Sequence, residues 1–80
     1  MIQKFFATVT GNNRIGYWEQ LKSSTLLGAK REATQTLTPT AYQGEQIQLV
    51  QVPPGMEERL NDLPHWEKTI KHNSKWAYKN

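Results

Sequence analysis

The sequence contains no cysteine, no long apolar run and only two histidines among its 80 residues. Without cysteine neither a disulfide nor a thiolate metal site can hold the fold together, and a reducing compartment suits such a chain. No segment approaches the ~20 apolar residues of a membrane-spanning helix, and residues 1–13 lack the apolar run of a signal peptide. We therefore expect a soluble, cytoplasmic protein.

The chain also lacks the residue patterns that catalysis and cofactor binding most often use. Neither GxxxxGK[ST] nor GxGxxG occurs, so the sequence has no phosphate-binding loop of either kind. His65 and His72 have no carboxylate partner that the local sequence would predict. The one acidic cluster, Glu57, Glu58 and Asp62, lacks the spacing and the turn glycine of an EF-hand. We predict a protein that is not an enzyme and that uses no cofactor and no metal.

Eighty residues make one domain, residues 1–80, and a chain of this length buries only about 60% of its unfolded surface. Three Trp, three Tyr and two Phe supply much of the available core. The net charge of +3 is modestly basic. Such a charge permits binding to nucleic acid or to an acidic protein surface without requiring it.

The segment Ser23–Leu37 is the only one with a clear helical period. Ser24 or Thr25 can cap its start, since a hydroxyl there accepts a hydrogen bond from a first-turn amide. Pro39 ends it, because proline disfavours helical geometry at the preceding residue. One face of the helix is apolar and consists of Leu26, Ala29, Ala33 and Leu37. Because this stripe is narrow and contains two alanines, we predict close packing of the helix on a sheet.

The other segments alternate as strands or form turns. The predicted strands are Ile2–Thr10, Arg14–Lys22, Gln46–Val52, Trp66–Lys71 and Lys75–Tyr78. Ile47 and Leu49 are expected to face the helix, and Met56–Pro64 is expected to be a loop with a short helix. The order β-β-α-β-loop-β-β predicts an α+β domain, a mostly antiparallel sheet with one helix packed on one face.

Basic residues gather with aromatic ones near the C-terminus and on the exposed side of the helix. The basic residues are Lys30 and Arg31 on the helix and Lys68, Lys71, Lys75 and Lys79 after Glu67, with Trp76 and Tyr78 among them. Lysines beside aromatic rings suit a phosphate backbone or a stacked base. The alternatives are that lysines keep strand edges from pairing with other chains, and that Trp76 belongs to the core.

Three stretches together resemble a pattern of small proteins from phages and mobile elements. They are the helix run TLLGAKREA (25–33), the apolar strand GEQIQLVQV (44–52) and the terminal stretch NSKWAYK (73–79). Some short anti-CRISPR proteins, including one group that inhibits type I-F surveillance complexes, are similar to this. The resemblance covers residues 17–78 and is interrupted by residues 53–64, a segment longer than the pattern requires.

The resemblance implies an inhibitor that docks on the crRNA–Cas backbone of a multi-subunit CRISPR-Cas effector in the bacterial cytoplasm and competes with DNA. The expected partner-binding residues are Lys30, Arg31, Lys68, Lys71, Lys75 and Trp76. Two other functions stay open from the residues themselves. One is a small basic module that binds nucleic acid directly, and the other is a phage accessory or structural protein that self-associates through a sheet edge.

Overall fold

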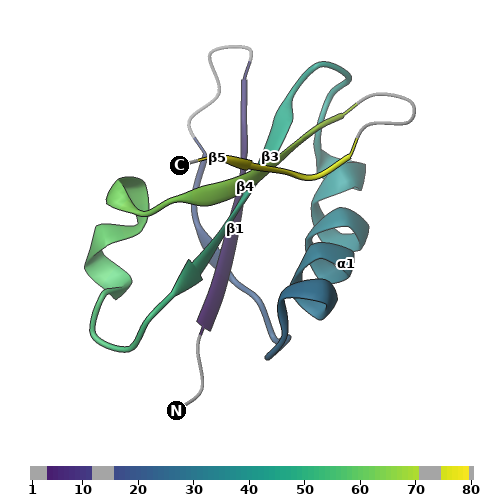
Figure 1. The fold of residues 1–80 in the computed structure, drawn as a ribbon. Helices are drawn as coiled ribbons and strands as arrows, with labels where there is room; N and C mark the ends of the chain where they lie inside the picture. The colour runs from purple at the N-terminus through teal and green to yellow at the C-terminus, as the bar shows by residue number, and fades with distance from the viewer. Residues whose placement is uncertain (1–3, 12–15, 71–74, 80) are drawn as a thin grey trace.

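The computed structural model describes residues 4–11, 16–70 and 75–79, which form one five-stranded sheet with a helix on one face (Figure 1). The strands are β1 (Lys4–Thr10), β2 (Glu19–Gln20), β3 (Gln46–Val52), β4 (His65–Thr69) and β5 (Ala77–Lys79). They lie in the order β2-β1-β3-β4-β5, and every neighbouring pair is antiparallel. The predicted α+β class and the antiparallel sheet are confirmed.

The helix α1 (Leu26–Leu37) begins after Thr25, whose extended backbone and hydroxyl form the N-cap. Thr25 Oγ1 accepts a hydrogen bond from the Gly28 N–H at 3.1 Å, which satisfies one of the free amides of the first turn. The alanines of the predicted stripe, Ala29 and Ala33, are fully buried. A short 3₁₀ turn, η1 (Thr38–Thr40), follows α1 directly. No helix in the described ranges has the length and apolar character needed to cross a membrane.

The main core lies between α1 and the two central strands. Alternate residues of β1 and β3 face the helix, and the register sets Ala7 opposite Leu49 and Val9 opposite Ile47. Both Ile47 and Leu49 are fully buried, which confirms that they face the helix. Small side chains on α1 allow the helix backbone to approach these larger strand residues closely, and this approach explains the alanine-rich stripe.

A second layer covers part of the opposite face of the sheet. Val50 and Val52 are buried there, although they alternate with the residues that face α1. The segment η2 (Glu57–Asp62) consists of 3₁₀ turns with a kink at Arg59, and it lies on the other side of the sheet from α1 (Figure 1). Its position is fixed by an ion pair of 3.4 Å between Lys4 Nζ and Glu57 Oε1 and by a hydrogen bond of 3.1 Å from Trp18 Nε1 to Asn61 Oδ1. The short helix expected in this segment therefore belongs to the fold.

The second strand is much shorter than predicted. Only Glu19 and Gln20 pair with β1, instead of the predicted Arg14–Lys22, of which residues 14–15 lie outside the described ranges. Gly16 lies so close to β1 that an added Cβ would be 2.5 Å from the carbonyl oxygen of Val9. The next residue, Tyr17, lies outside the ladder and is 80% exposed.

The last hairpin forms as expected but with shifted ends. Strand β4 covers residues 65–69 instead of 66–71, and β5 covers residues 77–79 instead of 75–78. Trp66 pairs with Tyr78 across the two strands. The predicted turn at residues 72–74 and the candidate residue Lys71 lie outside the described ranges.

Candidate binding surface

Side chains from α1, β4 and β5 meet on the helix side of the sheet. The register places Trp66 opposite Leu49 and Lys68 opposite Ile47, so both project from the same side as the main core. Tyr78 pairs with Trp66, and Trp76 packs against the core two residues before it. We call the group formed by Lys30, Trp66, Lys68, Trp76 and Tyr78 the α1–β4–β5 surface.

Contacts among the side chains fix the geometry of this surface. The ring centroids of Trp66 and Tyr78 are 5.0 Å apart with an interplanar angle of 58°. Lys30 Nζ lies 5.9 Å from the centroid of the Trp66 ring, within the range of a cation–π interaction. Tyr78 is 55% exposed, whereas Trp66 is half-buried. The surface therefore presents an open tyrosine ring beside an ammonium group that Trp66 helps to hold.

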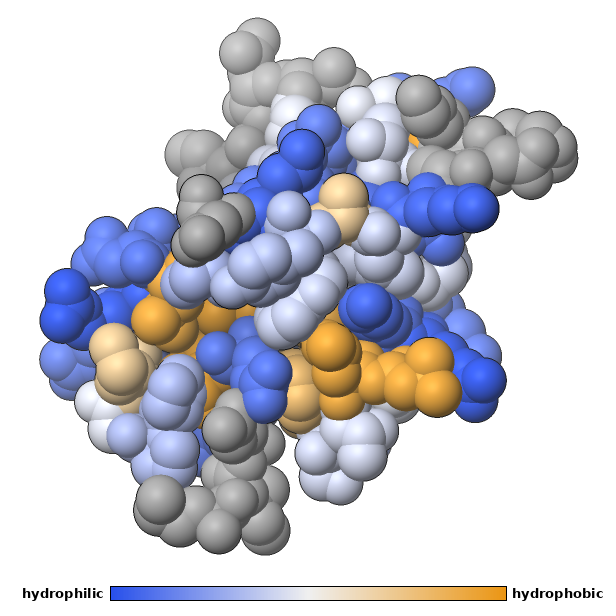
Figure 2. Space-filling model, in the orientation of Figure 1, coloured by the Kyte–Doolittle hydropathy of each residue, from blue (hydrophilic) through white to orange (hydrophobic). Residues whose placement is uncertain are grey.

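Among the described residues, no acidic side chain is exposed on the α1–β4–β5 surface, and this follows from the positions of all seven acidic residues. They are Glu19 on β2, Glu32 on the other flank of α1, the buried Glu45, Glu57, Glu58 and Asp62 in η2, and Glu67 on the opposite face of β4. Lys30 and Lys68 thus give the surface a positive potential that no neighbouring acid on the surface offsets. Figure 2 shows the molecule in the orientation of Figure 1, with hydrophilic residues around the apolar ones of the face in view.

The structure brings only some of the expected partner-binding residues together. Lys30 and Lys68 belong to the same surface, and Trp76 is half-buried against the core. Arg31 is exposed and lies about 100° further round the helix, so it points away from β4. Lys75 is exposed just before β5.

The sequence placed Tyr78 among the lysines near the C-terminus, but neither Tyr78 nor Trp66 was among the expected partner-binding residues. Both were placed on alternating strands, and the alternation across the predicted hairpin was the signal that could have selected them. The contact with Lys30 depends on how α1 lies beside β4, which no local pattern encodes.

The expectation that His65 has no neighbouring carboxylate is wrong. His65 Nε2 is 3.4 Å from Glu67 Oε2, because residues two apart in a strand project from the same face. This pair lies on the face opposite the α1–β4–β5 surface, where the register sets Lys79 across from His65. Among the described residues, no group of three or more histidine, aspartate or glutamate side chains is arranged to hold a metal ion.

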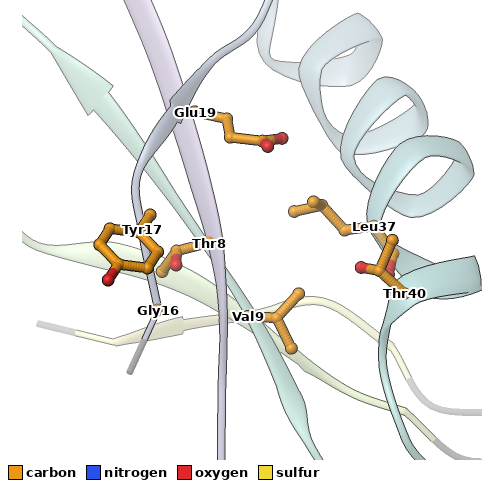
Figure 3. Close-up of a pocket in the computed structure, with 7 residues that line it drawn as sticks. All are labelled: Thr8, Val9, Gly16, Tyr17, Glu19, Leu37 and Thr40. Carbon is orange, nitrogen blue, oxygen red and sulfur yellow. The ribbon is translucent and has the colours of Figure 1, made fainter. Parts of the chain in front are cut away.

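A pocket lies at the other edge of the sheet, between β2 and the end of α1 (Figure 3). It has a volume of about 140 Å³ and is lined by Thr8, Val9, Gly16, Tyr17, Glu19, Leu37 and Thr40. The side chain of Glu19 extends from β2 towards α1, and Val9 and Leu37 face the same space (Figure 3). We call this the β2–α1 pocket. Pockets for drug-sized ligands measure roughly 300–1,000 Å³, so this one suits a single side chain or a small ion.

Comparison with protein-family models, curated proteins and solved structures finds no match to this chain. Its function is therefore inferred from the chemistry of the α1–β4–β5 surface.

Thr8 gives a testable prediction about the wall of the pocket. It is 3% exposed, and its hydroxyl has no hydrogen-bond partner in the described part of the chain. Replacing an unpaired buried hydroxyl by a methyl group of the same shape removes a desolvation cost, so Thr8→Val is expected to raise the free energy of unfolding by about 1 kcal/mol. Urea denaturation measures the change, with Thr10→Val as the control on the same strand. A loss of stability in Thr8→Val alone would show that the hydroxyl is bonded.

Proposed function

We propose that the protein acts by binding, as a non-catalytic inhibitor that docks its α1–β4–β5 surface on the RNA-bearing face of a multi-subunit CRISPR-Cas effector. One observation carries the proposal. Lys30 and Lys68 lie with Trp66 and Tyr78 on one face, where the described part of the chain exposes no acidic side chain. The resemblance of residues 17–78 to short anti-CRISPR proteins supports the choice of partner.

The composition of the surface suits an anionic macromolecular partner. Lys30 and Lys68 are half-buried, and their positive charges attract a negatively charged surface and select against positively charged partners. Aromatic side chains at the centre of an interface supply most of its binding energy, and Tyr78 is an open ring of this kind. A crRNA held on Cas subunits has the complementary charge. An inhibitor bound there competes with target DNA for the same positions.

Charge reversal on the surface is the test of this proposal. The double variant Lys30→Glu/Lys68→Glu is expected to bind a purified type I effector at least about 100-fold more weakly, since like charges in an interface cost several kcal/mol. Binding is measured by pull-down and by interferometry, and inhibition is measured as the loss of target DNA binding by the effector.

A matched control exists on the opposite face of the sheet. The double variant Arg59→Glu/Lys79→Glu changes the net charge by the same amount on two exposed residues, which belong to η2 and to the other side of β5. It is expected to retain binding within a few fold, apart from the general charge effect that both variants share. Equal losses in the two double variants would assign the effect to net charge instead of the surface. Failure of the unchanged protein to bind any CRISPR-Cas effector would reject the proposal.

Direct binding of single-stranded nucleic acid is the second candidate function. The exposed ring of Tyr78 beside Trp66 favours it, because stacking of one base on an aromatic ring contributes about 1–3 kcal/mol. Fluorescence anisotropy with single-stranded RNA and DNA over a salt series measures the affinity. The affinity is expected to fall as salt rises, and Tyr78→Ala is expected to weaken it. An affinity that does not depend on salt would rule this function out.

A further inference from the structure

Strand β5 forms one edge of the sheet, and among the described residues no strand lies on its outer side. Figure 1 shows β5 in front of the rest of the sheet. All three of its residues, Ala77–Lys79, are exposed. A strand in this position can offer its backbone N–H and C=O groups to another extended chain, which then adds to the sheet.

The hydrogen-bond pattern of the sheet shows which backbone groups of β5 face outwards. In an antiparallel pair, residues that exchange hydrogen bonds alternate with residues whose N–H and C=O groups point the other way. The Ile70 N–H donates to the carbonyl oxygen of Glu45 at 2.7 Å, and the register sets these two residues opposite each other. By alternation along β4, Trp66 also directs its backbone groups towards β3 and away from Tyr78. The N–H and C=O groups of Tyr78 therefore point outwards from the edge.

Two other observations agree with this assignment. Carried across β3 and β1, the same alternation directs the backbone groups of Phe5 towards β2, where its carbonyl oxygen accepts from the Leu21 N–H at 2.7 Å. Side chains lie closest in antiparallel pairs that exchange no hydrogen bonds, and the rings of Trp66 and Tyr78 are 5.0 Å apart. An extended chain beside β5 can therefore reach both backbone groups of Tyr78.

The side chains along this edge define the kind of strand that fits it. Trp76 and Tyr78 lie on the helix side of the sheet, and Ala77 and Lys79 lie on the other side. Lys75 is exposed just before β5, and Lys79 is exposed at its end, so each end of the edge carries a positive charge. Opposite charges and apolar pairs stabilise neighbouring strands. A strand with acidic residues at its ends and apolar residues beside the aromatic rings therefore fits best.

The same charges disfavour a second copy of the chain as the occupant. The chain has a net charge of +3, and lysines at a strand edge oppose pairing with another basic edge. The opposite edge of the sheet differs, because β2 contains the acidic Glu19. An acidic strand is therefore attracted to β5 and not to β2.

We propose that the edge of β5 binds an acidic, extended segment of a protein partner, which adds to the sheet as a further antiparallel strand. The residue opposite Tyr78 exchanges two backbone hydrogen bonds with it, and carboxylates at the ends of the segment pair with Lys75 and Lys79. The antiparallel direction follows the rest of the sheet and is the more stable one. This inference uses the backbone of β5 and two lysines outside the α1–β4–β5 surface, so it does not rest on the proposed function.

Titration with short peptides tests the proposal on the full chain by ¹H–¹⁵N NMR. The probe is acetyl-Glu-Val-Ala-Val-Glu-amide, and the control is the same peptide with lysine in place of both glutamates. The acidic peptide is expected to give saturable shifts at Ala77–Lys79, with a Kd on the order of 1 mM for so small a contact. It is also expected to slow hydrogen exchange at the Tyr78 N–H.

Three results of this titration would overturn the proposal. The first is equal affinity for the two peptides. The second is a set of shifts that is absent or that centres on β2. The third is protection of the Tyr78 N–H that rises with protein concentration in the absence of peptide, because the occupant would then be a second copy.

Methylation of single peptide nitrogens tests the backbone contact. In the antiparallel alignment the first valine lies opposite Tyr78 and points its N–H at β5, whereas the central alanine points its N–H away. An N-methyl group on that valine is expected to weaken binding at least about tenfold, since a hydrogen bond is lost and the Tyr78 carbonyl oxygen is left facing a methyl group. The same group on the alanine is expected to leave the Kd nearly unchanged. Equal effects at the two positions would overturn the strand geometry.

Lys79→Gln tests the charge at the end of the edge. It is expected to weaken the acidic peptide about two- to fivefold, the effect of losing one cross-strand pair of opposite charges. Arg31→Gln removes the same charge from the exposed side of α1 and is the control, expected to leave the Kd unchanged apart from a general charge effect. Equal losses in the two variants would assign the effect to net charge and overturn the pairing with Lys79.

Discussion

Leu49→Ala is expected to lower the free energy of unfolding by about 2–5 kcal/mol, the range found when a fully buried leucine is truncated. Leu49 is 0% exposed and lies in the middle of the central strand β3, where it pairs with Ala7 on one side and Trp66 on the other. It also faces α1 across the main core. Truncation therefore opens a cavity where three strands and the helix meet.

The size of the chain makes this loss severe. At roughly 0.05–0.15 kcal/mol per residue, a domain of 80 residues has a total stability of only about 4–12 kcal/mol. Urea denaturation followed by tryptophan fluorescence measures the change. Leu27→Ala provides the same chemical truncation on α1, where Leu27 is 61% exposed, and it is expected to change stability by less than about 0.5 kcal/mol. Similar losses in both variants would contradict the position of the core.

Local patterns were enough to predict the helix, the central strand and the class of fold. The alanine and leucine stripe of α1 repeats at helical spacing, and the run Gln46–Val52 ends at two prolines, so both elements are defined by their own residues. Thr25 as the N-cap also follows from local chemistry. Each of these features is indicated by the residues of a single element, through their spacing or through a local hydrogen bond.

The shorter β2 and the second layer could not be predicted in this way. The close approach of Gly16 to Thr8 and Val9 depends on how the chain returns beside β1, which the alternation of residues within one strand does not indicate. Val50 and Val52 are buried by a layer on the other side of the sheet, and a single strand cannot indicate that both of its faces are covered. The place of η2 depends on contacts with Lys4 and Trp18, both far from it in sequence.

The candidate sites likewise have parts that the sequence predicts and parts that only the structure reveals. The order of residues alone indicated that lysines and aromatic residues are concentrated near the C-terminus. Only the register of the strands shows that Lys68 shares a face with Trp66. The contact between Lys30 and Trp66 joins α1 to β4. The β2–α1 pocket gave no signal in the sequence, since its residues come from three separate stretches of the chain, each with ordinary local properties.

Glu32→Gln is expected to lower the free energy of unfolding by about 1–2 kcal/mol, a value reduced from that of a buried charged acceptor because solvent partly screens the site. The carboxylate of Glu32 accepts hydrogen bonds from the Lys22 N–H at 3.0 Å, the Ser23 N–H at 2.9 Å and the Ser23 hydroxyl at 2.8 Å. It therefore ties the connection after β2 to the side of α1. A glutamine has the same shape and can accept at one oxygen, but it carries no charge, and its NH₂ group cannot accept the second hydrogen bond from the Lys22 N–H.

The same contacts predict how the stability depends on pH. Partial burial alone would raise the pKa of Glu32, but the hydrogen bonds from Lys22 and Ser23, with the positive charge of Lys22, outweigh it and hold the pKa below its ordinary value of 4.5. In the unfolded chain the carboxyl takes up a proton at a higher pH than in the folded one. The contribution of Glu32 to stability is therefore complete above about pH 4.5 and is lost as the pH falls towards the folded pKa.

The difference in stability between the unchanged protein and Glu32→Gln isolates this group from the other carboxylates that titrate in acid. We expect the difference to be constant between about pH 6 and 8 and to shrink below about pH 4.5, as Glu32 becomes protonated and the two proteins become electrostatically equivalent at this site. Glu58→Gln serves as the control, because Glu58 is exposed in η2, and its difference is expected to stay near zero throughout. Urea denaturation at a series of pH values provides both curves. If the difference for Glu32→Gln widened on acidification, the carboxylate would be bound in its protonated form, and the hydrogen bonds from Lys22 and Ser23 would not be what holds α1 to β2.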